Sequence, residues 1–118
     1  MTIDVKNRDG VIVLKPHGRL IGPAGNELRQ VIETQLQLTS EATNFLFNFA
    51  DCLRIDSVAV GVLVGLHVSI AQRGGVIGVT NLSTSLKSYF VMAKLITAFK
   101  HFNSENEAIV NLRGGEGD

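Results

Sequence analysis

The chain has 118 residues, of which 45% are hydrophobic and 19% charged, and its eleven basic residues balance eleven acidic ones. This composition is typical of a folded globular domain that closes a core without disulfides or metal, and it argues against a broad nucleic-acid surface, which needs an excess of basic residues. Cys52 is the single cysteine, which excludes an internal disulfide and fits a reducing compartment.

Neither a signal peptide nor a membrane span is expected. The first ten residues are mixed and polar. The longest apolar run, 58–71, is 14 residues long and contains His67 and Ser69, which falls short of the ~20 residues that a spanning helix needs. The histidines show no metal-ligand spacing. We therefore expect a cytoplasmic protein with no membrane insertion, no metal and no cofactor.

The N-terminus predicts a β-hairpin. Residues 2–6 alternate apolar and polar side chains, as an edge or half-buried strand does. Residues 11–15 are apolar and rich in β-branched side chains, which suits a central strand. Asp9-Gly10 between them favours a tight turn.

A helix and a buried strand are expected next. Residues 22–25 read Gly-Pro-Ala-Gly and break the chain, and Pro23 suits the first turn of a helix. An apolar stripe at helical spacing continues to about Leu38. Residues 44–49 then place three phenylalanines around Leu46, which predicts a strand covered on both faces.

The second half alternates helices and strands. We expect a helix over 58–73, a strand over 76–80, a helix over 84–94, a short strand near 98–101 and a last helix from Ser104 to Leu112. Gly74-Gly75 supplies the left-handed residue that ends a helix. The pattern predicts an α/β fold, with a mixed sheet of four to five strands, an N-terminal hairpin and about four helices. We expect one domain over 1–113 and a flexible tail over 114–118.

The candidate site lies where Asp56-Ser57 precedes the long apolar helix. Switches and ligands in open α/β sheets gather where parallel strands end, and this pair follows the third strand. Taken alone, both residues are helix caps, because Asp or Ser before an apolar run accepts hydrogen bonds from the first free N–H groups. A helix N-terminus also tolerates a phosphate. A phosphoacceptor role for Ser57 therefore stays open.

An ordered set of motifs resembles the STAS domain of bacterial anti-sigma factor antagonists, from about residue 3 to 112. The motifs are Gly18-Arg19-Leu20, Glu27-Leu28-Arg29, Ile55-Asp56-Ser57, Gly61-Val62-Leu63 and Arg73-Gly74-Gly75. The resemblance implies a STAS-like fold and a regulatory binding protein, not an enzyme. Its partner would be an anti-sigma factor of the serine-kinase type, from which binding releases the sigma factor.

The resemblance also implies a switch and a contact surface. The kinase would phosphorylate Ser57, with Asp56 as cap and serine-orienting residue, the phosphorylated protein would no longer bind, and a phosphatase would reset it. The partner would contact the loop before the first helix and the exposed part of the helix after Ser57. The expected contact residues are Gly22, Pro23, Ala24, Gly25, Arg54, Val58, Val60, Gly61 and Val64. Gly61 and Gly65, four residues apart, are expected to pack closely against the sheet.

Two alternatives stay open. Ala59 stands where the family usually has glycine, and Ile21 where many members have aspartate. These departures favour a STAS module that is never phosphorylated and serves as a scaffold or a transporter-associated subunit. A hydrolase with Ser57 as nucleophile ranks last, because the Gly-x-Ser-x-Gly elbow is missing.

Overall fold

The N-terminal hairpin opens the fold, which a computed structural model describes for residues 2–40 and 42–113. β1 (Thr2–Arg8) and β2 (Val11–Leu20) are antiparallel. Asp9 and Gly10 join them with φ angles of 53° and 89°. Two successive positive φ angles are those of a type I′ turn, whose twist matches that of the strands it connects.

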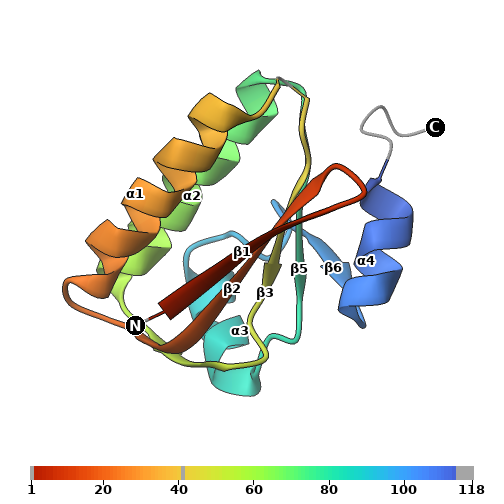
Figure 1. The fold of residues 1–118 in the computed structure, drawn as a ribbon. Helices are drawn as coiled ribbons and strands as arrows, with labels where there is room; N and C mark the ends of the chain where they lie inside the picture. The colour runs from red at the N-terminus through yellow and green to blue at the C-terminus, as the bar shows by residue number, and fades with distance from the viewer. Residues whose placement is uncertain (1, 41, 114–118) are drawn as a thin grey trace.

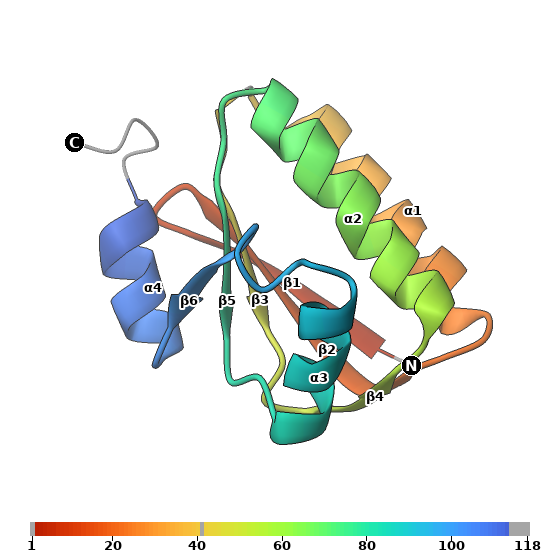
Figure 2. The ribbon, with the colours of Figure 1, turned by 180° about the vertical axis from the view of Figure 1, so that it is seen from behind.

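The sheet has six strands and is mixed, with the order β1-β2-β3-β5-β6 (Figure 1). β4, labelled in Figure 2, also pairs with β2. The strands β3 (Phe45–Asn48), β5 (Ile77–Thr80) and β6 (Lys100–Phe102) follow one another in parallel. β4 (Cys52–Ile55) is parallel to the end of β2. Gly18, with a φ of 94°, lies at a register shift where β2 changes partner from β3 to β4.

The helices cover both faces of the sheet (Figures 1 and 2). The helices α1 (Ala24–Leu38), α2 (Ser57–Gln72) and α3 (Thr84–Met92) bury side chains in one cluster with β2, β3 and β5. α4 (Glu105–Leu112) packs on the opposite face, against alternate residues of β2 and β3. The larger core therefore lies under α1, α2 and α3.

Strand β3 confirms the predicted two-sided burial. Phe45 and Phe47 of β3, and Phe49 just after its end, are at most 1% exposed and belong to the larger core. Leu46, between them, faces α4. Burying a phenylalanine contributes roughly 1.5–3 kcal/mol, so this short strand anchors both layers.

The α/β class, the hairpin, the mixed sheet and the four helices are confirmed. The strand count was one too low, because β4 lies in a stretch that the sequence presents as a polar link. Its ends Cys52 and Ile55 are buried while Leu53 and Arg54 are exposed, so the strand shows no alternation. The expected tail over 114–118 lies outside the described residues. Within the described ranges, no helix has the length and apolarity to cross a membrane.

Candidate functional site at the start of helix α2

Asp56 ties the start of α2 to the loop before α1. Its backbone is extended, its Oδ1 accepts the N–H of Ala59 at 3.0 Å, and its Oδ2 accepts the N–H of Gly22 at 2.7 Å. Its own N–H donates to the carbonyl of Leu20 at 3.1 Å. The predicted capping role is confirmed, and one carboxylate fixes two segments that lie 34 residues apart in the chain.

The same donors set the charge of Asp56. The Ala59 N–H is the largest influence and lowers the pKa of the carboxyl below its usual value. Burial opposes this effect, and the Gly22 N–H adds to the lowering. Hydrogen bonds to the ionised form favour that form. Asp56 is therefore a carboxylate at neutral pH.

Ser57 is the first residue of α2, and its side chain is exposed. Its hydroxyl forms no hydrogen bond with any residue that the structure describes. The spacing of Ser57, Gly61, Val64 and Val68 puts them on one side of a helix. All four are exposed, with Val64 at 38% and Val68 at 48%. We call these four residues the Ser57 face.

The loop before α1 lies against the start of α2. A Cβ on Gly25 would come within 2.8 Å of Cγ1 of Val58, so only glycine fits this approach. Gly22 and Pro23 are exposed, but Ala24 and Gly25 are buried. These last two residues support the loop and offer no outer surface, because the first turn of α1 is pressed onto α2.

The predicted packing of Gly61 and Gly65 against the sheet is wrong. Both are exposed, and a Cβ on either would meet no atom within 4 Å. They line a hollow of about 300 Å³ between α1 and α2. The four-residue spacing predicts that the two glycines share one face of α2, but it does not determine whether that face points to the sheet. Larger side chains occupy the side that faces the sheet. These are Ala59, Val62, Leu63, Leu66 and Ile70.

The other predicted contact residues differ in exposure. Val58 is 46% exposed, whereas Val60 is half-buried against the core. Arg54 is exposed and lies beside Arg19 in the paired strands β4 and β2. Neither guanidinium forms an ion pair within residues 2–40 and 42–113.

Cys52 and the departures Ile21 and Ala59 lie inside or at the edge of the core. Cys52 is buried, as predicted, and burial raises the pKa of its thiol. Ala59 is completely buried and Ile21 half-buried. The described part of the chain holds no cluster of three or more side chains suited to a metal.

The STAS domain family matches residues 2–108, almost the whole chain. This chain belongs to the STAS domain family. The match extends from β1 into α4 and includes Asp56, Ser57 and the loop before α1.

Solved structures share the fold of this STAS domain at low identity. A putative anti-sigma factor antagonist from Thermotoga maritima is 20% identical over 94% of each chain, with a TM-score of 0.84. The anti-sigma factor antagonist SpoIIAA in its unphosphorylated form is 20% identical, over 96% of this chain and 99% of that one, at a TM-score of 0.76. Its phosphorylated form, from Bacillus, is 22% identical over 95% and 100% at the same TM-score.

A transporter protein also shares the fold. A sulfate transporter family protein from Wolinella succinogenes is 18% identical over 86% of this chain and 83% of that one, with a TM-score of 0.71. At these identities the structural likeness establishes the fold of the STAS domain, and its site must be judged from the residues themselves.

Two parts of this site were missed from the sequence. Val68 completes the Ser57 face, and the i, i+4, i+7, i+11 spacing from Ser57 carries that signal. The Gly22–Asp56 hydrogen bond has no sequence signal, because it depends on how the α1 loop meets α2 in three dimensions.

Proposed function

We propose that this STAS domain is a cytoplasmic anti-sigma factor antagonist, switched off by phosphorylation of Ser57. It binds an anti-sigma factor of the serine-kinase type and thereby releases the sigma factor, and a phosphatase resets it. One observation carries the proposal. The exposed Ser57 hydroxyl stands at the end of an exposed, largely apolar helix face, next to an ionised Asp56.

The position of Ser57 makes this a switch in binding and not in folding. A phosphate at the first residue of α2 meets the positive end of the helix, which favours anions. It adds about −1.5 to −2 charges beside the single charge of Asp56. A partner that packs on the Ser57 face would have to desolvate this charge or place a like charge against it.

The exposed valines support a partner surface. Val64 and Val68 keep apolar side chains in water, and Gly61, between Ser57 and Val64, allows a partner's backbone to approach closely. Gly22 and Pro23 extend this surface from the neighbouring loop, which Asp56 holds in place. SpoIIAA, with the same fold, is named as an anti-sigma factor antagonist and has a phosphorylated form.

Mass spectrometry tests the phosphorylation. The protein is incubated with ATP and a purified anti-sigma factor of the serine-kinase type, and the intact mass is measured. We expect one added phosphate in the wild type, none in Ser57→Ala, and one in Ser85→Ala, which removes an exposed hydroxyl from the first turn of α3. Phosphate that persists on Ser57→Ala would refute the assignment.

A STAS module that is never phosphorylated is the second candidate function. It is favoured by Ile21 and Ala59 and by the likeness to the Wolinella transporter protein. Unchanged mass with the kinase, together with binding of the unmodified protein to a transporter or scaffold partner, would favour this candidate over the first. A hydrolase is disfavoured, because a nucleophilic serine needs a base within hydrogen-bonding reach and the Ser57 hydroxyl has none among the described residues.

A further inference from the structure

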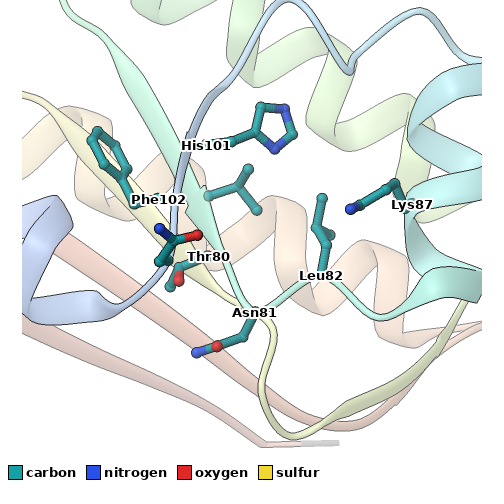
Figure 3. A pocket seen from close by; sticks show the side chains of 8 residues that line it. Thr80, Asn81, Leu82, Lys87, His101 and Phe102 are labelled. Carbon is teal, nitrogen blue, oxygen red and sulfur yellow. The ribbon is translucent and has the colours of Figure 1, made fainter.

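The two strands at the ends of the sheet order differ in length. Within residues 2–40 and 42–113, β1 pairs only with β2, and β6 only with β5. β6 has three residues, and its last two, His101 and Phe102, border a hollow beside the end of β5 (Figure 3). β1 has seven residues, most of them exposed. A long exposed edge is a template on which another strand can pair, whereas a very short edge protects a sheet from such pairing.

Every second residue of β1 turns its backbone to the free edge. The turn hydrogen bond of a two-residue loop joins the residues that flank it, here Arg8 and Val11, which pair in register. Hydrogen bonding then alternates along an antiparallel strand, so the even-numbered residues of β1 bond to β2. The N–H and C=O groups of Ile3, Val5 and Asn7 point outward. These three residues can bond to a further strand without disturbing the hairpin.

The side chains of β1 carry a charge pattern that is complementary to itself. Ile3 packs against the larger core, so Ile3 and Val5 share that face of the strand, whereas Asp4 and Lys6 lie on the other face. Asp4 and Lys6 are exposed and flank Val5, which is 38% exposed. Oδ2 of Asp4 lies 2.8 Å from Nε2 of His17, and Lys6 forms no ion pair with any described residue. The centre of the edge is therefore an exposed valine between opposite charges.

We propose that two copies of this chain associate by antiparallel pairing of their β1 strands, with the two-fold axis at Val5. Val5 of one copy then pairs with Val5 of the other, and Ile3 of each copy pairs with Asn7 of the other. Because these residues have the outward backbone groups, main-chain hydrogen bonds join the two sheets into one. Asp4 of each copy lies directly opposite Lys6 of the other, and opposite charges attract at such cross-strand positions.

The same charges disfavour the neighbouring registers. An axis at Asp4 would place two carboxylates opposite each other, and an axis at Lys6 would do the same with two ammonium groups. An axis between two residues would bring outward backbone groups opposite residues that already bond to β2. Axes nearer the ends of β1 pair fewer residues. The dimer uses neither Ser57 nor the loop before α1, so it does not depend on the proposed switch.

Sedimentation velocity of the full chain tests the proposal. We expect the mass to rise from that of one chain, 12.7 kDa, toward twice that value. The rise should occur between about 10 μM and 1 mM, because one short strand from each copy forms a small and weak interface. The amides of Ile3, Val5 and Asn7 should exchange with deuterium more slowly at the higher concentration. A single-chain mass over this whole range would overturn the proposal.

Val5→Pro tests the main-chain pairing. The N–H that proline lacks points to the free edge, where proline is tolerated in a strand. The midpoint of thermal unfolding should therefore change little, while dimer formation should be lost. Val5→Thr keeps the N–H and is the control, which should still form the dimer. A dimer that persists in Val5→Pro would place the contact elsewhere and refute the pairing of β1.

Two charge variants test the register. Asp4→Lys leaves two positive charges on β1, and Lys6→Asp leaves two negative ones. Each variant should form its own dimer about tenfold or more weakly than the wild type, because two symmetric pairs become repulsive at once. An equimolar mixture should form a mixed dimer, in which every charge faces its opposite. Recovery in the mixture also shows that both variants are folded. Wild-type self-association of either variant, or a mixture that stays monomeric, would contradict the register.

Discussion

Helices α2 and α4 both begin with a side-chain cap, yet only the first turn of α4 carries acidic side chains. Asp56 caps α2 and Ser104 caps α4, each by accepting an N–H three residues on. In α4, Glu105 and Glu107 fill the first turn with negative charge. The first turn of α2 has no acidic side chain and presents the Ser57 hydroxyl to solvent.

The acidic groups of α4 are engaged in structural bonds. Glu105 lies 2.6 Å from Nη1 of Arg8 and accepts Nδ2 of Asn48 at 3.0 Å. Burial tends to raise its pKa, but the bonds from Asn48 and Arg8 outweigh this and keep the pKa below the usual value. Glu107 accepts the N–H of Asn103 at 2.7 Å. The start of α4 thus fastens the helix to the sheet, whereas that of α2 still has room for an added anion.

The largest expected effect is on partner binding. Ser57→Asp places a charge at the end of the Ser57 face and should lower affinity for the anti-sigma partner at least about 30-fold, corresponding to about 2 kcal/mol or more. Asn106→Asp adds the same charge to the first turn of α4 and should leave affinity unchanged. Titration calorimetry measures both. Wild-type affinity in Ser57→Asp would show that the proposed charge exclusion is wrong.

Asn48→Ala should have the largest effect on stability. Asn48 is buried, accepts the N–H of Ala50 and Nδ2 of Asn81, and donates to Glu105. Its loss leaves these groups unpaired and should cost about 2–3 kcal/mol of unfolding free energy. Urea denaturation checks this, with the exposed Asn111→Ala as a control expected to stay within about 0.5 kcal/mol. Similar losses of unfolding free energy in both variants would show that the hydrogen bonds of buried Asn48 stabilise the fold no more than those of exposed Asn111.

Gly25→Ala tests the contact that sets α2 apart. The added methyl would press on Val58 at 2.8 Å, and overpacking of this kind costs about 1–3 kcal/mol. The same variant should weaken partner binding, because the loop and the start of α2 are forced apart. A denaturation curve that matches the wild type would show that the loop before α1 and the start of α2 can move apart without loss of stability.

The two caps should differ in their response to pH. Asp56→Ala and Ser104→Ala should each cost about 1 kcal/mol at neutral pH. Because the folded pKa of Asp56 is lowered, its stabilisation is complete above the unfolded pKa and is lost as pH falls through the folded value. The loss of unfolding free energy caused by Asp56→Ala should therefore shrink below about pH 4, while the loss caused by Ser104→Ala persists. A parallel decrease of both losses in acid would contradict this difference.

The smallest expected effect is a gain. Gly61→Ala adds a methyl that meets no atom within 4 Å, so the helix should be more stable by about 0.5–1 kcal/mol. If the Ser57 face binds a partner closely, the same methyl should weaken that complex. Thermal unfolding and calorimetry separate the two results, and unchanged affinity would remove Gly61 from the contact surface.

Regular periodicity made most of the fold predictable. The phenylalanines of β3 and the glycines after α2 mark their elements locally, and Asp56 and Ser57 were identified because a cap precedes an apolar run. Strand β4 was not identified from the sequence, because an edge strand of four residues with two exposed in its middle shows no alternation of apolar and polar side chains. The orientation of Gly61 and the burial of Gly25 depend on contacts between distant segments, which no local pattern contains.

The double attachment of Asp56 has a consequence for exchange with solvent. A single carboxylate holds the amide protons of Gly22 and Ala59. Any event that turns this side chain, such as crowding by a phosphate on Ser57, should release both protons to deuterium together. Correlated hydrogen exchange of these two amides would therefore report whether Ser57 is phosphorylated, without a partner present.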